Sequence, residues 1–134
     1  MLDPHSALIY TMVIVSAADS DMTDAEMAIT GDIVGHLPVF RDFDRQQLPS
    51  VLQACTRMLN REDGLEEAFA EIKAALPANL RETAYAIACD VAAADGEATQ
   101  EELRVLEMMR HRLNIDRLIA AGIERGARAR FQTL

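Results

Sequence analysis

The sequence has few aromatic residues and few cysteines. It contains no Trp, four Phe, two Tyr and two Cys. Because sheets are rich in aromatic and β-branched side chains, this composition disfavours a β protein. Cys55 and Cys89 stand alone, without a Cys-x-x-Cys motif, so no disulfide framework or zinc site is indicated. We expect both to be buried free thiols in a reducing compartment.

Basic residues are scarce relative to acidic ones. There are 13 Lys and Arg against 22 Asp and Glu, which gives a net charge of −9. A nucleic-acid partner is disfavoured, because such partners select a basic surface. Anionic membrane surfaces are disfavoured for the same reason, and cations or basic proteins remain as natural partners.

Long hydrophobic runs are also missing. The longest, residues 7–18, contains Ser16 and is too short to span a bilayer. The first residues lack the basic region of a secretory signal. These observations predict a cytoplasmic protein with no direct membrane insertion.

The residues that are abundant are those of packed helices. Half of the chain is apolar, mainly Ala, Leu, Ile, Val and seven Met. Apolar spacing, capping residues and breaks predict an all-α fold, a compact bundle of about seven helices forming one domain over residues 1–134. The expected helices span about 4–18, 23–35, 44–59, 65–76, 79–94, 99–113 and 116–128. Capping residues are expected at Asp3, Thr23, Asp44, Asn79, Thr99 and Asp116. Met27 is expected on the inward apolar face of the second of these helices, and Leu103 on that of the sixth.

An internal duplication is the most informative pattern. When the chain is shifted by 76 residues, segment 15–26 aligns with segment 91–102, and six of the twelve positions are identical. Each segment is a helix end, an acidic loop and the start of another helix. The repeat halves cover about 4–35 and 79–113. One such helix pair cannot bury its own apolar faces, so the two copies are expected to pack together.

The stretch Ala92-Ala93-Ala94-Asp95-Gly96-Glu97-Ala98-Thr99-Gln100-Glu101-Glu102-Leu103 resembles the signature of TerB-type tellurite resistance proteins. The resemblance covers most of the chain, although the first loop has Ser20 where the signature has Gly. It implies an all-helical domain with an acidic face. It also implies a role in tellurite and other stress responses, with a protein partner in a stress-response complex that is membrane-associated and metal-linked.

The two acidic loops are the candidate binding site. Carboxylate oxygens suit hard divalent cations such as Ca²⁺, Mg²⁺ or Mn²⁺. The loops are too short for an EF-hand, because Glu26 and Glu102 come at the eighth position counting the Asp as the first, rather than at the twelfth. Any site is expected to be open, water-rich and weak, or to be completed across the two repeats. The alternative is that these two Glu residues only complete capping boxes. The candidate ligands are Asp19, Asp21, Glu26, Asp95, Glu97 and Glu102.

No catalytic constellation is visible. His5, His36 and His111 are isolated, and there is no Glu-x-x-His pair, nucleophile elbow or phosphate-binding loop. Asp90 lies in an Ala-rich helix, either on a solvated face of small residues or facing a metal or partner. The sequence therefore predicts a non-enzymatic stress-response protein whose acidic loops bind a divalent cation or a basic protein. The alternative is a metal-free helical module for protein–protein interaction.

Overall fold

Every regular element that the structure describes is helical. The computed structural model describes residues 2–19 and 22–134, and over these residues it has seven α-helices, three short 3-10 helices and no strand. This confirms the all-α class. The α-helices are α1 (Pro4–Ala17), α2 (Asp24–His36), α3 (Leu48–Leu59), α4 (Gly64–Ala75), α5 (Arg81–Ala93), α6 (Gln100–Arg112) and α7 (Arg117–Arg130).

Short polar side chains begin several of these helices. The Asp3 carboxylate accepts a hydrogen bond from the Ser6 N–H at the start of α1, and Asp116 accepts from two N–H groups of α7. The predicted cap at Asn79 is wrong. A 3-10 turn over Ala78–Leu80 leads directly into α5, and the N-cap residue Leu80 makes no side-chain hydrogen bond.

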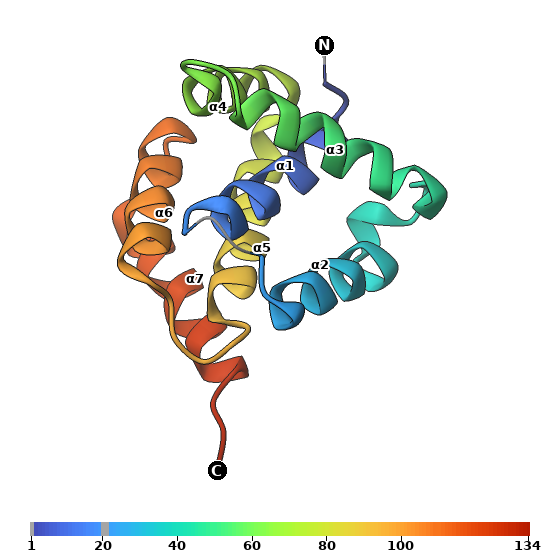
Figure 1. Ribbon diagram of the computed structural model, residues 1–134. Coiled ribbons are helices and arrows are strands. Elements are labelled where there is room, and N and C mark those ends of the chain that lie inside the picture. Colours follow the sequence, from blue (N-terminus) through green and yellow to red (C-terminus); the bar gives the residue numbers. More distant parts are fainter. Residues whose placement is uncertain (1, 20–21) are drawn as a thin grey trace.

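Helices α1 and α5 form the centre of the bundle and pack against each other (Figure 1). Every residue of α1 from Ala7 to Ser16 is buried. Because α1 is apolar almost all round, it can be covered on every side. Helix α5 is buried mainly through small side chains, among them Ala84, Ala88 and Ala92, which allow the two helices to approach closely.

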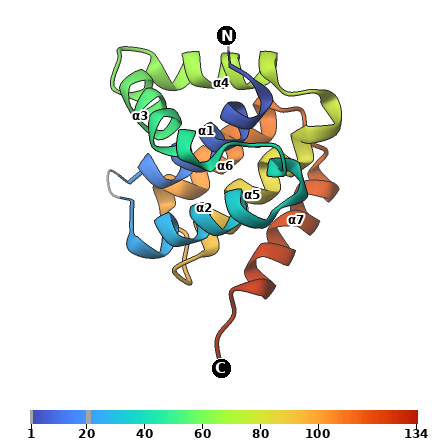
Figure 2. The same ribbon diagram turned by 90° about the vertical axis from the view of Figure 1, so that its right-hand side faces the viewer.

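The remaining helices surround this central pair. Helices α2 and α3 lie on one side and α6 and α7 on the other, while α4 covers one end and contacts α1 and α3 (Figures 1 and 2). The outer helices cross between the two halves of the chain: α2 packs on α5, and α6 packs on α1. The two helix–loop–helix segments of the predicted duplication are therefore in direct contact.

Two apolar residues are more exposed than the sequence indicated. The expected inward positions of Met27 and Leu103 are wrong, because these side chains are 54% and 49% exposed. Each is the fourth residue of a helix that begins with a capping box. At that position an apolar side chain commonly packs on the residue before the N-cap, here Met22 or Ala98, instead of entering the core.

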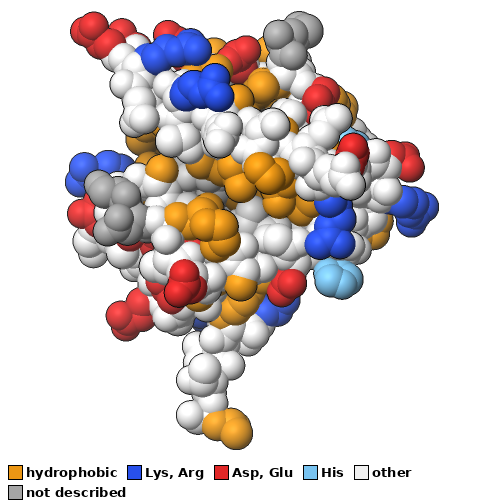
Figure 3. Space-filling view, turned by 45° about the vertical axis from the view of Figure 1, so that its right-hand side comes forward, with side chains coloured by type: hydrophobic (Ala, Val, Ile, Leu, Met, Phe, Trp, Pro, Cys, Tyr) orange, Lys and Arg blue, Asp and Glu red, His pale blue; other side chains and the backbone are white. Residues whose placement is uncertain are grey.

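The face that carries α2 and α3 has an apolar centre. Figure 3 shows hydrophobic side chains gathered there, with charged side chains around them. Both helices leave apolar residues only half buried against the core, including Ile29, Val51 and Leu52. In the part of the chain that is described, no helix has the length and apolar character needed to cross a membrane.

Candidate functional site

Two equivalent capping boxes begin α2 and α6. The Thr23 hydroxyl accepts a hydrogen bond from the Glu26 N–H at 3.0 Å, and Glu26 Oε1 accepts from the Thr23 N–H at 2.9 Å. The second box has the same bonds between Thr99 and Glu102, at 3.1 and 2.9 Å. Both capping boxes predicted from the sequence are therefore present, and each occupies one oxygen of its glutamate.

Both glutamates are buried, which a capping role alone does not require. Glu26 and Glu102 are each 1% exposed. Glutamate is almost never fully buried unless its charge is compensated. In each residue the second oxygen, Oε2, is buried without any hydrogen-bond partner. Leaving such an atom unpaired inside a protein is costly, so these two oxygens call for a proton or a ligand.

The two carboxyl groups lie within hydrogen-bonding reach of each other. Burial, the hydrogen bond with Glu26 and the charge of Glu26 raise the pKa of Glu102 to about 8, against the opposing effect of the Thr99 backbone bond. Each Oε1 already accepts a hydrogen bond from a threonine N–H, so Oε2 is the oxygen of each carboxyl group that is left without a partner. With its pKa raised to about 8, Glu102 keeps its proton at neutral pH, and that proton can be donated to the Glu26 carboxylate.

A third carboxyl group lies close to this pair. Asp19 follows the C-terminal end of α1, and its Oδ1 is buried without a hydrogen-bond partner. Its negative charge also contributes to the raised pKa of Glu102. Across residues 2–19 and 22–134, no three potential ligand side chains already stand in the arrangement of a metal site. Asp19 is thus near the pair, without being positioned as a third ligand.

The other predicted site residues are less closely connected to the pair. Asp95 and Glu97 are exposed, and neither contributes to the raised pKa of Glu102. Asp21 lies outside the described residues. Gly96 has a φ of +96°, the left-handed conformation expected for a glycine at the end of α5. The structure therefore brings together Glu26, Glu102 and Asp19 from the six predicted ligands.

The structure shows that the two repeats each contribute one glutamate to a single buried pair. The sequence left open whether a site lies on one loop or is completed across the two repeats, and it did not predict that Glu26 and Glu102 are both buried. Asp90, whose role was left open, pairs with Arg130 and so links α5 to α7. The Tyr85 hydroxyl donates to Glu124 at 2.5 Å and makes a second link between the same helices.

Neither thiol is suited to nucleophilic chemistry. Cys55 and Cys89 are free and buried, as predicted. Burial raises the pKa of each thiol to about 12, so the reactive thiolate is not formed at neutral pH.

One of the comparisons with known proteins gives a match. The family model described as tellurite resistance protein TerB matches residues 5–122. The match includes both acidic loops, both capping boxes, the helices from α1 to α6 and the start of α7. Searches of curated proteins and of solved structures find no match.

Proposed function

Because the chain belongs to the TerB family of tellurite resistance proteins, we propose that it is a non-enzymatic stress-response protein in which Glu26 and Glu102 bind a divalent cation. The observation that supports this most is the buried pair of carboxyl groups, each with one unpartnered oxygen. A proton held by Glu102 satisfies these atoms in the free protein. A cation satisfies them better, because it compensates two negative charges instead of one.

The residues present fit a hard cation. Glu26 and Glu102 would each supply Oε2 while Oε1 stays on its threonine N–H, and Asp19 would supply a further oxygen after a small movement. Such oxygen sets suit Ca²⁺, Mg²⁺ or Mn²⁺, with water completing the coordination. Asp95, Glu97 and Asp21 remain candidates for an outer set of acidic groups that attracts the ion.

The same geometry argues for weak binding. Both glutamates lie in the first turn of a helix, where the helix dipole favours negative charge and opposes a cation. The cation must also displace the proton of Glu102 before it binds. Because α2 and α6 come from different halves of the chain, a bound cation would join those halves and stabilise the native state.

Calorimetric titration tests this proposal. We expect Ca²⁺, Mg²⁺ or Mn²⁺ to bind near pH 8 and to bind up to about tenfold more weakly for each pH unit below that, as one proton is displaced. Titrations in two buffers of different ionisation enthalpy should count about one proton released. Glu102→Gln should abolish binding and proton release together. Glu101→Gln, which alters an exposed acid one residue away, is the matched control.

The proposal is wrong if wild-type protein shows no heat of binding and no change in melting temperature in millimolar Ca²⁺, Mg²⁺ or Mn²⁺. It is also wrong if Glu102→Gln binds as tightly as the Glu101→Gln control. The second candidate, a metal-free interaction module, would then be favoured. The exposed Met27 and Leu103, each beside an acidic helix start, support that candidate through a basic protein partner with apolar side chains.

A further inference from the structure

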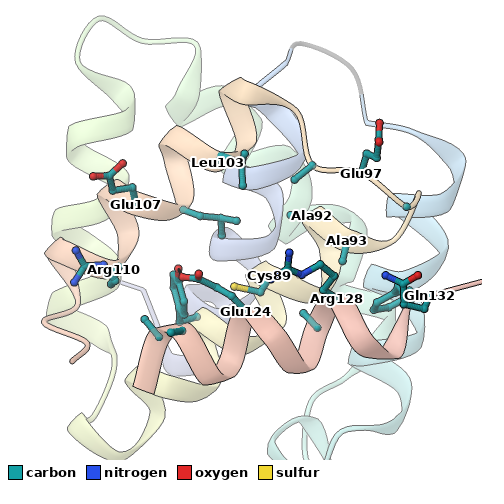
Figure 4. Close-up of a pocket in the computed structure, with 18 of the residues that line it drawn as sticks. Cys89, Ala92, Ala93, Glu97, Leu103, Glu107, Arg110, Glu124, Arg128 and Gln132 are labelled. Carbon is teal, nitrogen blue, oxygen red and sulfur yellow. Dashed lines mark hydrogen bonds between the residues drawn. The ribbon is translucent and has the colours of Figure 1, made fainter. Parts of the chain in front are cut away.

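A groove between α6 and α7 has no role in the proposed cation site. Its volume is about 1040 Å³, and α5 forms its floor (Figure 4). Cys89, Ala92 and Ala93 line the bottom, and Leu103 of α6 lies on one wall. Figure 4 shows that Glu124 and Arg128 of α7 lie along the opposite side.

The apolar lining of the groove consists largely of small side chains. Ala92, Ala120 and Ala127 are buried, whereas the half-buried Ala93 and Ala98 and the exposed Ala121 remain accessible and contribute only methyl groups. Small residues allow the backbone of another helix to approach closely, because neighbouring helices pack at 8–10 Å between axes. Leu103, about half exposed, adds a larger apolar contact at the edge.

Charged side chains of both signs line the two walls. Arg117 and Arg128 lie on α7, whereas Glu97 and Glu107 lie on the loop before α6 and on α6 itself. Arg110 of α6 also lines the groove, and its guanidinium donates a hydrogen bond to the Ile115 carbonyl oxygen. None of the charged residues that line the groove takes part in the three salt bridges found over residues 2–19 and 22–134. Glu124 accepts a hydrogen bond from the Tyr85 hydroxyl. Helix α7 is locally basic, with four Arg and one Glu, in a chain whose net charge is −9.

We propose that this groove binds an amphipathic α-helix of a partner protein. The apolar face of that helix packs on Ala93, Leu103 and Ala121. Acidic side chains on one flank pair with Arg117 and Arg128, and basic side chains on the other flank face Glu97 and Glu107. A second copy of this chain is a poorer occupant because two chains of −9 repel each other. An anionic membrane is disfavoured by the same charge and by the recessed floor.

The test uses model helices with an Ala/Leu face. One peptide carries Glu along one flank and Lys along the other, and the second carries Lys on both flanks. The overall charge of −9 favours the all-Lys peptide, whereas the groove favours the mixed one. Fluorescence anisotropy in EDTA should show the mixed peptide binding at least about fivefold more tightly. Because EDTA removes divalent cations, peptide binding is measured independently of the proposed cation site.

Variants locate the binding. Arg128→Glu should weaken the mixed peptide by about five- to tenfold, whereas Arg57→Glu on the exposed face of α3 should not. Ala121→Trp should block the groove and Ala54→Trp should not, and both sites are exposed, so folding is preserved. Tighter binding of the all-Lys peptide, equal loss with Arg57→Glu, or no binding of either peptide at millimolar concentration would overturn the proposal. If the protein binds anionic vesicles and neither peptide, the proposal is also overturned, and the basic helix α7 is assigned to a membrane surface instead.

Discussion

The buried carboxyl pair should make the stability of the free protein depend on pH in an unusual direction. The pKa of Glu102 is raised from 4.5 to about 8 in the folded state, so between these values the folded protein binds a proton that the unfolded chain has released. The stabilisation is fully present below about pH 4.5 and is lost as pH rises to about 8. The expected slope is a loss of about 1.4 kcal/mol per pH unit for one proton.

Urea unfolding followed by circular dichroism, in EDTA, measures this slope. Between about pH 5 and pH 7 the free energy of unfolding should fall by about 2–3 kcal/mol, which is large beside a typical total of about 5–15 kcal/mol. The other raised values, those of Tyr10, Tyr85 and both cysteines, belong to groups that titrate above this window. They therefore leave the slope unchanged.

Glu102→Gln isolates the cause. Its amide oxygen can still accept from the Thr99 N–H, and its NH₂ can donate to Glu26 in place of the proton that Glu102 donates. The slope should then fall below about 0.5 kcal/mol per pH unit, because the variant has no proton to release at this position. Glu101→Gln should keep the wild-type slope. Wild-type stability that stays flat or rises across the window, or an equal slope in Glu102→Gln, would refute the reasoning.

Three further predictions concern single side chains. Thr99→Ala removes the hydroxyl that accepts a hydrogen bond from the Glu102 N–H, and it should lower the free energy of unfolding by about 1 kcal/mol. Asp95→Asn alters an exposed position and should change the free energy of unfolding by less than about 0.5 kcal/mol. Gly31→Ala should raise the free energy of unfolding by about 0.5–1 kcal/mol, because no atom lies near the added methyl group. Gly64→Ala should lower the free energy of unfolding by more than about 1 kcal/mol, because its Cβ would lie 2.0 Å from the Met58 carbonyl oxygen. Equal effects of the two substitutions would contradict this. Both thiols should react with a disulfide reagent only after unfolding, and fast labelling of native protein would disprove their burial.

Local sequence signals predicted the fold well because helix starts and ends are determined by nearby residues. Asp3, Thr23, Thr99 and Asp116 all act as N-caps where the sequence placed them. The prediction failed at Asn79, because a 3-10 turn before α5 needs no side-chain cap. It failed for Met27 and Leu103 because helical periodicity identifies an apolar position without showing which neighbours cover it.

The candidate site was harder to predict because its two halves are far apart in the chain. The sequence indicated that Glu26 and Glu102 complete capping boxes, and they do. It gave no information that α2 crosses to α5 and α6 to α1, which brings the two glutamates together and buries them. Equal spacing in two repeats therefore identified the residues, whereas only tertiary packing shows that they form one buried pair.

The crossed packing of α2 on α5 and α6 on α1 has a consequence for how the protein opens. Neither half keeps a complete core when the other is removed, since the buried residues of α1 and α5 cover each other. Local opening of one half is therefore coupled to opening of the other, and we expect amide hydrogens in α1 and α5 to exchange with the free energy of global unfolding. The molecule behaves as a single cooperative unit, in contrast to the independent modules of an extended repeat array.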